Sequence, residues 1–332
     1  MKLSSIFTSN AVLPAKKPIR IFGEGNGKCE IEFAGIKKVI VSNEETWCAE
    51  FPAMEYGGPY TITFKTEDSL VCLDEIYIGE VYLFAGQSNI AFMLSSSNTP
   101  KEKYEENEKL SLFKIPNDLS LEVSWQKARL GTIEEFSALG YLTGNEISKS
   151  NDVHVGIIQC AHGASVIDSW LPYGTLDRLG ISFKEEEMHY DRFGEYGAWN
   201  EEGYLYNKML RRMIPYSLSG VIWYQGESNA AEGEALSYEK MLRELIKIWR
   251  DDFKNENLPF TIVQIADTHE RMAEGYGWRV IQEAQEKVGT TEKNAYLVIS
   301  KDICETDDIH PQSKFGLAMR VSDIIKNHYF DN

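Results

Sequence analysis

The chain has 332 residues, with a hydrophobic fraction of 43% and a charged fraction of 26%, as in ordinary globular proteins, and this length allows one large domain or two of average size. Its formal net charge of −17 at pH 7 argues against DNA, RNA and anionic membranes as partners, because binding phosphate requires clustered cations. The sequence shows no transmembrane segment or signal peptide, and its five cysteines form no C-x-x-C pair, so we expect a cytoplasmic protein without a disulfide framework or a zinc site.

The first 75 residues have the pattern of β structure. Short alternating runs at 19–22, 29–33, 39–41 and 60–64 are separated by segments of glycine, asparagine, serine and proline, which form turns. Strands at this spacing are typical of a small sandwich. We therefore predict an N-terminal β-rich, sandwich-like subdomain over residues 1–75, which we interpret as a structural appendage.

From residue 76 onward, apolar strand candidates alternate with helical stretches. The strand candidates occupy 81–85, 112–115, 153–158, 221–223, 260–265 and 296–299. The helical candidates occupy 133–147, 238–249, 278–288 and 315–325. This alternation predicts an α/β fold for residues 76–332, with a parallel central sheet in a three-layer α/β/α arrangement. The glycine-rich and aromatic segment 171–200 interrupts it, and we interpret that segment as a rim over the active-site edge.

A candidate nucleophile follows the first of these strands. Val81–Ala85 is apolar without alternation, as in a strand buried on both faces of a parallel sheet. Gly86 permits a sharp turn, and the polar residues Gln87, Ser88 and Asn89 follow at the carboxyl end, where open α/β sheets bind ligands. A serine in this position is presented for nucleophilic attack, although an ordinary turn has the same pattern.

A candidate base follows the last predicted strand. Of the six histidines, His310 lies between that strand and the last helix, again at the carboxyl edge of the sheet. Asp307 precedes it by three residues, so its carboxylate can meet the imidazole across one turn and fix the tautomer, a spacing that favours Asp307 over Asp308. The same residues are also compatible with a helix cap that has Pro311 at the first helical position, and both interpretations can hold together.

Acyl transfer also requires donors for an oxyanion. The backbone N–H of Ser88 is one candidate, and Gly163, which follows the strand at 153–158, is another because its missing side chain allows close approach to a substrate. In a third polar turn after a strand, Gln225 can supply an amide donor, with Asn229 as the alternative. Glu227 of the same turn is a candidate for hydrogen bonds to its neighbours or to substrate hydroxyls.

Three blocks of this sequence together resemble the SGNH-type hydrolases and, within them, the sialate O-acetylesterase family of carbohydrate acetylesterases. The blocks are Gly86-Gln87-Ser88-Asn89, Trp223-Tyr224-Gln225-Gly226-Glu227-Ser228-Asn229 and Asp307-Asp308-Ile309-His310-Pro311. The resemblance spans residue 13 to the C-terminus. It implies a flavodoxin-like α/β/α catalytic domain. The chain differs from the family pattern at His162 and Ala164, where family members often have tryptophan and a second glycine.

The resemblance also implies the roles of individual residues. Ser88 would be the nucleophile, His310 the general base and then acid, and Asp307 its orienting partner. The backbone N–H groups of Ser88 and Gly163 and the side chain of Gln225 would form the oxyanion hole. The substrate-binding residues would be Gln87, Asn89, Glu227 and Asn229.

We therefore expect a serine esterase that removes acetyl groups from a sugar through an acyl-enzyme, with no metal and no organic cofactor. Its partner would be an acetylated carbohydrate, either an O-acetyl sialic acid or an acetylated plant polysaccharide such as xylan. The alternative from another class is a catalytically silent carbohydrate-binding protein. The sequence leaves the sugar, the hydroxyl position and the oligomeric state open.

Overall fold

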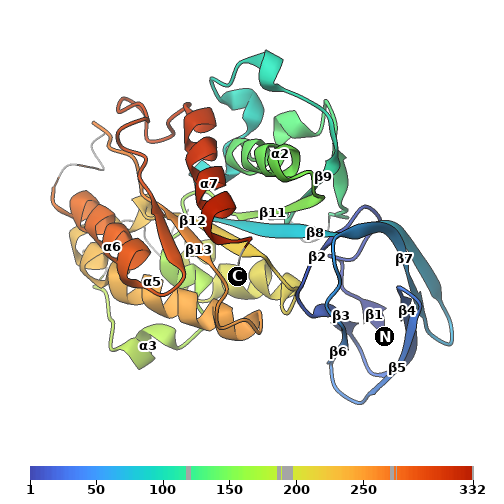
Figure 1. The fold of residues 1–332 in the computed structure, drawn as a ribbon. Coiled ribbons are helices and arrows are strands. Elements are labelled where there is room, and N and C mark those ends of the chain that lie inside the picture. Colours follow the sequence, from blue (N-terminus) through green and yellow to red (C-terminus); the bar gives the residue numbers. More distant parts are fainter. Residues whose placement is uncertain (117–120, 185–187, 189–196, 270–272, 274, 331–332) are drawn as a thin grey trace.

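The computed structural model describes residues 1–116, 121–184, 188, 197–269, 273 and 275–330 (Figure 1). Within these residues the chain has a mixed α/β fold, which confirms the predicted class. Its N-terminal strands are β1 (Lys2–Leu3), β2 (Val12–Pro14), β3 (Ile19–Glu24), β4 (Gly27–Phe33), β5 (Ile36–Ser42), β6 (Thr46–Phe51) and β7 (Gly57–Lys65). The strands that follow are β8 (Leu70–Gly86), β9 (Asn107–Lys114), β10 (Gln126–Ala128), β11 (Val155–Ala161), β12 (Gly220–Tyr224), β13 (Phe260–Val263) and β14 (Ala295–Val298).

The large sheet is mixed. Among the described residues its main path runs β10-β9-β11-β8-β12-β13-β14. The six strands from β9 to β14 on this path pair in parallel, whereas β10 pairs with β9 antiparallel. The sheet also includes β7, which pairs antiparallel with the first half of β8, and β4 and β5 beyond it. The second half of β8, from Ile78 to Gly86, is buried throughout, as expected for a strand covered on both faces.

Helices cover both faces of the parallel strands. Figure 1 shows α2 (Ala138–Asn151) and α7 (Lys314–His328) on one side, and α5 (Glu232–Asp252) and α6 (Gly277–Thr291) on the other. The shorter helices are α1 (Ser88–Ala91), α3 (Thr175–Leu179) and α4 (Tyr204–Lys208). Helix α5 buries the side chains that recur at helical spacing in the sequence, so the predicted apolar face is confirmed. These side chains are Tyr238, Met241, Leu242, Leu245, Ile246 and Trp249.

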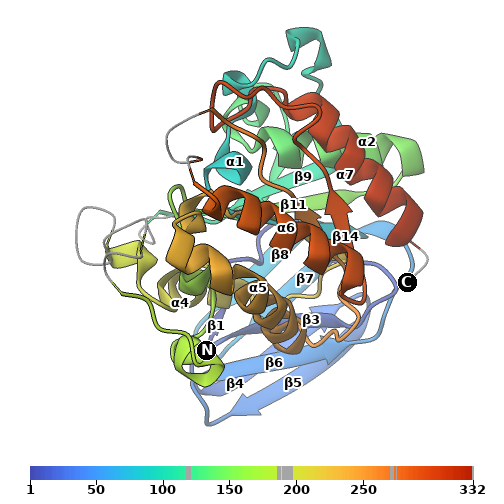
Figure 2. The same cartoon turned by 90° about the vertical axis from the view of Figure 1, so that its left-hand side faces the viewer.

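The N-terminal strands β3 to β7 gather at one end of the molecule, away from α2 and α7 (Figure 2). The strands β1, β3 and β6 form a separate three-stranded antiparallel sheet. The predicted boundary between residues 75 and 76 falls inside β8, which belongs to both the antiparallel and the parallel pairings. The division into residues 1–75 and 76–332 stays a prediction.

The predicted rim at 171–200 is only partly described. It contains α3, and part of its aromatic and acidic content, including the run 185–187, lies outside the described residues. Within the described ranges, no helix combines the length and the apolar character that crossing a membrane requires.

Candidate active site

The turn after β8 presents Ser88. Gly86 has a φ of 142°, and a Cβ atom there would lie 2.0 Å from the carbonyl oxygen of Tyr224 on the neighbouring strand β12. Only glycine is compatible with this conformation and this close approach. The Gln87 N–H donates to the same oxygen at 3.2 Å, so the turn is anchored to β12. Ser88 then opens α1 and is partly exposed.

The structure brings Ser88 and His310 together across 222 positions of sequence. The distance between Ser88 Oγ and His310 Nε2 is 2.8 Å, the hydrogen-bonding distance that a nucleophile and its base require. Asp308 Oδ1 lies 3.7 Å from His310 Nδ1 and also accepts a hydrogen bond from the His310 backbone N–H at 2.7 Å. Asp307 is exposed, and the described part of the chain provides no hydrogen bond or ion pair to its side chain. The predicted orienting role of Asp307 stays a prediction.

The loop after β11 lies beside the nucleophile. A Cβ atom on Gly163 would lie 3.9 Å from Ser88 Cβ, so the backbone of Gly163 is close to the reacting serine, as an oxyanion donor must be. The His162 N–H donates to the Gly86 oxygen at 3.1 Å and ties this loop to the nucleophile turn. Ala164 has a φ of 53°, in the left-handed region, where glycine would be unstrained.

His162, which stands where the family pattern has tryptophan, also borders this loop. Its Nδ1 lies 2.9 Å from the Gly163 oxygen, and its ring packs against Trp199 with centroids 4.8 Å apart. Burial lowers the pKa of His162. The residue therefore contributes a half-buried ring to the loop that lies beside Ser88.

Gln225 is bonded within the protein. Its Nε2 donates to the Ser165 oxygen at 2.9 Å and to Asn229 Oδ1 at 2.8 Å, which uses both amide hydrogens. Its Oε1 accepts from the Tyr238 hydroxyl at 3.0 Å. In this arrangement Gln225 has no hydrogen left for an oxyanion, and it holds the loop of Ser165 instead. The oxyanion role assigned to Gln225 stays a prediction, and these contacts favour the alternative, Asn229.

Asn229 is fully buried, and the nitrogen of its side-chain amide has no hydrogen-bond partner within the described residues. Its Oδ1 accepts from the Ile167 N–H at 2.9 Å as well as from Gln225, and this fixes the orientation of the amide. Its Nδ2 is buried and makes no hydrogen bond within the described residues. An unpaired buried donor is costly, so it indicates a functional role rather than a packing role. Of the two candidate amides, Asn229 is therefore the one that keeps an uncommitted donor among the described residues, and its oxyanion role stays a prediction.

The remaining predicted substrate-binding residues are buried, and their hydrogen bonds join the turn after β8 to the turn after β12. These residues are Gln87, Asn89 and Glu227. Gln87 Oε1 accepts from the backbone N–H groups of Gly226 and Ser228, both at 3.3 Å. Asn89 Nδ2 donates to Glu227 Oε1 at 2.6 Å, and burial raises the pKa of this glutamate. Their contact with substrate stays a prediction, and their burial favours a role in positioning the three loops.

Sequence reasoning missed two residues of this site. Asn200 is fully buried, accepts from the Val166 N–H and donates to the Ala164 oxygen, each at 2.9 Å, so it secures the loop of Gly163. Lys314 is fully buried and donates to Asn89 Oδ1 at 2.6 Å. An asparagine in a long loop and a lysine at the start of a helix are both ordinarily exposed, so no local signal marks either residue.

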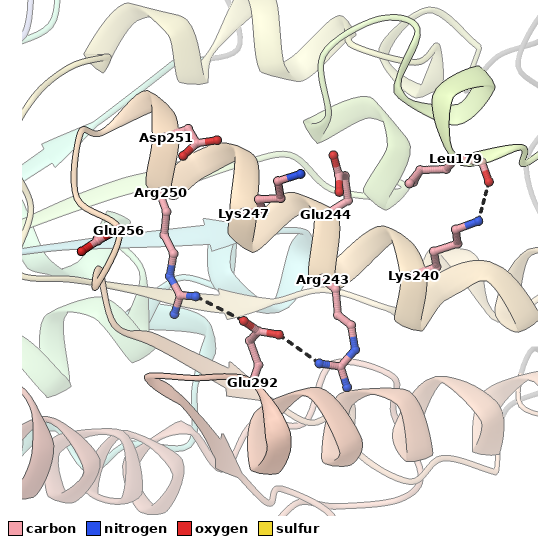
Figure 3. A pocket seen from close by; sticks show the side chains of 9 residues that line it. All are labelled: Leu179, Lys240, Arg243, Glu244, Lys247, Arg250, Asp251, Glu256 and Glu292. Atoms are coloured by element: carbon pink, nitrogen blue, oxygen red, sulfur yellow. Dashed lines mark hydrogen bonds and ion pairs between the residues drawn. The ribbon is translucent and has the colours of Figure 1, made fainter.

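A surface pocket of about 540 Å³ lies elsewhere, along α5 (Figure 3). None of its lining residues belongs to the loops of Ser88, Asn229 or His310. Its arginines Arg243 and Arg250 share the carboxylate of Glu292, so they are not free to bind an anion. Within the described ranges, no group of three or more histidine, cysteine, aspartate or glutamate side chains is arranged to hold a metal ion.

A carbohydrate esterase family described as sialic acid-specific acetylesterase matches residues 78–320, more than half of the chain, including Ser88, Asn229 and His310. The chain belongs to this family. The match to the acetylesterase family begins inside β8 at residue 78, where the buried segment that leads to Ser88 also begins. The family resemblance in the sequence is thereby confirmed.

Individual proteins that are similar to this chain carry names of the same kind as the family. The chain is similar to the sialate O-acetylesterases of Homo sapiens and Mus musculus, with 24% identity to each over 325 and 354 residues. These alignments cover 86% and 88% of this chain but 61% and 65% of the relatives, so the chain spans less than two thirds of their length. In structure it is similar to a carbohydrate acetylesterase from Xanthomonas citri, with 25% identity and a TM-score of 0.86, covering 100% of this chain and 76% of that one.

Proposed function

We propose that this protein is a carbohydrate O-acetylesterase, a serine hydrolase that removes acetyl groups from acetylated sugars. The observation that carries the proposal is the 2.8 Å contact between Ser88 Oγ and His310 Nε2 at the carboxyl edge of the parallel strands. A catalytically silent sugar-binding protein has no need for this pair. Family membership and the names of the human and Xanthomonas citri relatives point to the same chemistry.

The reaction proceeds in two acyl transfers. Ser88 Oγ attacks the acetyl carbonyl carbon while His310 Nε2 takes the hydroxyl proton, and the carbonyl oxygen becomes an oxyanion. The N–H groups of Ser88 and Gly163, with Asn229 Nδ2, stabilise this oxyanion. The carbon–oxygen bond to the sugar then breaks, and His310 protonates the departing hydroxyl. Water, deprotonated by His310, attacks the acetyl-enzyme and releases acetate and free Ser88.

The carboxylate that orients His310 is Asp307 in this proposal. Asp308 already accepts the backbone N–H of His310 and so shapes the turn, whereas the Asp307 carboxylate is uncommitted within the described residues and lies at the spacing that reaches the imidazole across one turn.

For the substrate, we propose an O-acetylated sialic acid, with acetylated xylan or a similar plant polysaccharide as the alternative. The human and mouse relatives are named for sialate, and this supports the first. Arg178 and Arg320 are paired with the carboxylates of Glu244 and Asp302, so we assign neither arginine to the sialate carboxylate. Acetate release measured side by side on O-acetyl sialic acid and on acetylated xylan oligomers decides between the two substrates.

We also propose that residues 76–332 form an SGNH-type, flavodoxin-like α/β/α catalytic unit and that residues 1–75 are a β-rich appendage to it. Two observations support this division. Six strands, β9, β11, β8, β12, β13 and β14, pair in parallel between two helical layers, and the family match begins at residue 78.

The experiment that tests the function is Ser88→Ala assayed on p-nitrophenyl acetate. The loss of the nucleophile should leave only residual turnover, on the order of 10⁻⁴ or less of the wild-type kcat. A thermal unfolding curve measured alongside should match that of the wild type, because Ser88 is partly exposed. Turnover at the wild-type level in this variant would refute the assignment.

A further inference from the structure

The side chain of Asn89 joins three loops of the site. Its Nδ2 donates to Glu227 Oε1 at 2.6 Å and to the Ile309 carbonyl oxygen at 3.1 Å, and its Oδ1 accepts from Lys314 Nζ at 2.6 Å. Asn89 directly follows Ser88, and Ile309 directly precedes His310. The amide therefore connects the segment that carries the nucleophile to the segment that carries the base.

The partners of this amide define its orientation. A carboxylate and a carbonyl can only accept hydrogen bonds from Nδ2, and an ammonium group can only donate to Oδ1. Turning the amide by half a rotation would bring Oδ1 against two acceptors and Nδ2 against a donor, so the alternative orientation loses all three hydrogen bonds. Lys314 is the partner that requires an oxygen, and so it fixes which end of the Asn89 amide is Oδ1.

Lys314 is held in an unusual place for a cation. It is fully buried at the start of α7, with its Nζ 4.9 Å from the ring centroid of Phe92 and 5.7 Å from that of Tyr224. The Phe92 ring also stacks on His310, with centroids 6.3 Å apart. A buried cation costs free energy unless it is compensated, and Glu227, bonded to the other end of the Asn89 amide, is a buried opposite charge.

We propose that Lys314 is a positioning residue of the hydrolase, which acts through Asn89 to hold the His310 loop against Ser88. Glu227 is the counter-charge of this arrangement, so the three residues form one unit: carboxylate, amide and ammonium. The inference rests on the proposed function, because it assigns Lys314 a role in the same reaction. Neither Lys314 nor Asn89 touches the reacting atoms in this role.

The unit has a consequence for the pH dependence of the reaction. Burial lowers the pKa of Lys314 to about 8, and the charged or titratable groups that face it are Glu227 from the β12 turn and Cys304, Glu305 and Asp308 from the loop before α7. Below that pH the ammonium is present and balances Glu227. As the pH rises through the Lys314 pKa, the ammonium is lost, the amide is held less firmly, and kcat should fall.

The test compares Lys314→Met with wild type on p-nitrophenyl acetate. At neutral pH we expect kcat to fall roughly 10- to 100-fold, because the base is misplaced, while KM stays within about a factor of two. The wild-type kcat should decline toward the variant's value above the Lys314 pKa, and the variant should lack this decline. Lys326→Met, on the same helix but in a surface ion pair with Glu146, is the matched control and should keep the wild-type kcat.

The double variant E227Q/K314M covers the case in which the single variant does not fold. It removes both buried charges, so it should fold and show a kcat between those of Lys314→Met and wild type. A wild-type kcat and pH profile in folded Lys314→Met, or a wild-type kcat in the double variant, would overturn the inference. An active Ser88→Ala would instead overturn the proposed function, so the two failures are distinct.

Discussion

The hydrogen bonds of Gln225 and Asn229, the two amides of the β12 turn, indicate a division of roles between them. Both are fully buried, and both were candidates for the oxyanion donor in the sequence. Gln225 donates both amide hydrogens within the protein, one of them to Asn229 Oδ1, whereas Asn229 Nδ2 makes no hydrogen bond within the described residues. We therefore propose that Gln225 orients the amide of Asn229 and that Asn229 Nδ2 is the oxyanion donor.

This division predicts different outcomes for two variants. Asn229→Ala removes the available donor, so kcat should fall by about 10²- to 10³-fold with KM little changed. Gln225→Ala removes contacts to Ser165 and Tyr238 as well, so its main effect should be a loss of stability, seen as a lower thermal unfolding midpoint. The division is wrong if Gln225→Ala keeps wild-type stability and yet loses more kcat than Asn229→Ala.

The carboxylate beside His310 gives a second prediction at this scale. If Asp307 fixes the imidazole, Asp307→Asn should lower kcat by roughly 10²- to 10⁴-fold, because the wrong tautomer is then favoured. Asp308→Asn keeps an oxygen that can accept the His310 N–H, so its effect should be smaller. Steady-state kinetics of both variants decide the question, and a larger loss in Asp308→Asn would transfer the role to Asp308.

Residues that carry chemistry were more predictable than residues that support it. Ser88 and His310 follow strands at one sheet edge, a position that the local sequence pattern reveals. The roles of Asn200 and Lys314 depend on neighbours more than 30 and 200 positions away, respectively, and no local pattern encodes such contacts. For the same reason the sequence left Gln225 and Asn229 as alternatives.

At the scale of elements, the close approach of β8 and β12 determines where the serine stands. The strands pair in parallel with Gly86 opposite Tyr224, and the missing side chain lets the Tyr224 oxygen face the turn directly. The end of β8, Val81–Ala85, and helix α5 were predictable from their apolar patterns, whereas the first part of β8, from Leu70, was not predicted as a strand. Strand β6 was missed, although its side chains alternate between exposed and buried as in a strand with one face open to solvent.

Gly86→Ala should disrupt this approach. A methyl group 2.0 Å from a backbone oxygen forces one strand to move, so we expect a loss of roughly 2–4 kcal/mol in the free energy of unfolding and a large loss of kcat. The matched control is Gly131→Ala, which also has a positive φ, 94°, but no atom within 4 Å of the added carbon. Equal losses of stability in the two variants, measured by urea unfolding, would show that backbone strain rather than the clash is decisive.

At the scale of the whole molecule, His154 lies where the N-terminal strands meet the parallel strands. Its ring stacks on Tyr77 of β8 with centroids 3.7 Å apart, and its carbonyl accepts the Glu80 N–H at 2.9 Å. Burial lowers the pKa of His154 from 6.5 to about 4. The unfolded chain therefore binds a proton that the folded chain excludes between these two values.

This difference predicts that acid destabilises the protein through His154. Stability should be fully retained above the unfolded pKa and fall as the pH drops from about 6.5 to about 4. Since the ring is half-buried, we expect a contribution on the order of 1 kcal/mol at the acid end of this range. His154→Phe keeps the stacking and removes the titration, so its urea unfolding free energy should depend less on pH. An unchanged pH dependence in the variant would exclude His154 as the cause.

The continuity of β8 has a consequence for exchanging parts between relatives of this protein. Residues 70–86 form one strand that pairs with β7 at its start and with β11 and β12 at its end, so no linker separates the N-terminal strands from the nucleophile turn. Side chains on a strand alternate between two faces. A single residue inserted near position 76 would therefore move the buried side chains on one side of the insertion to the opposite face of the sheet. Chimeras should therefore be joined in a loop before β8, never within it.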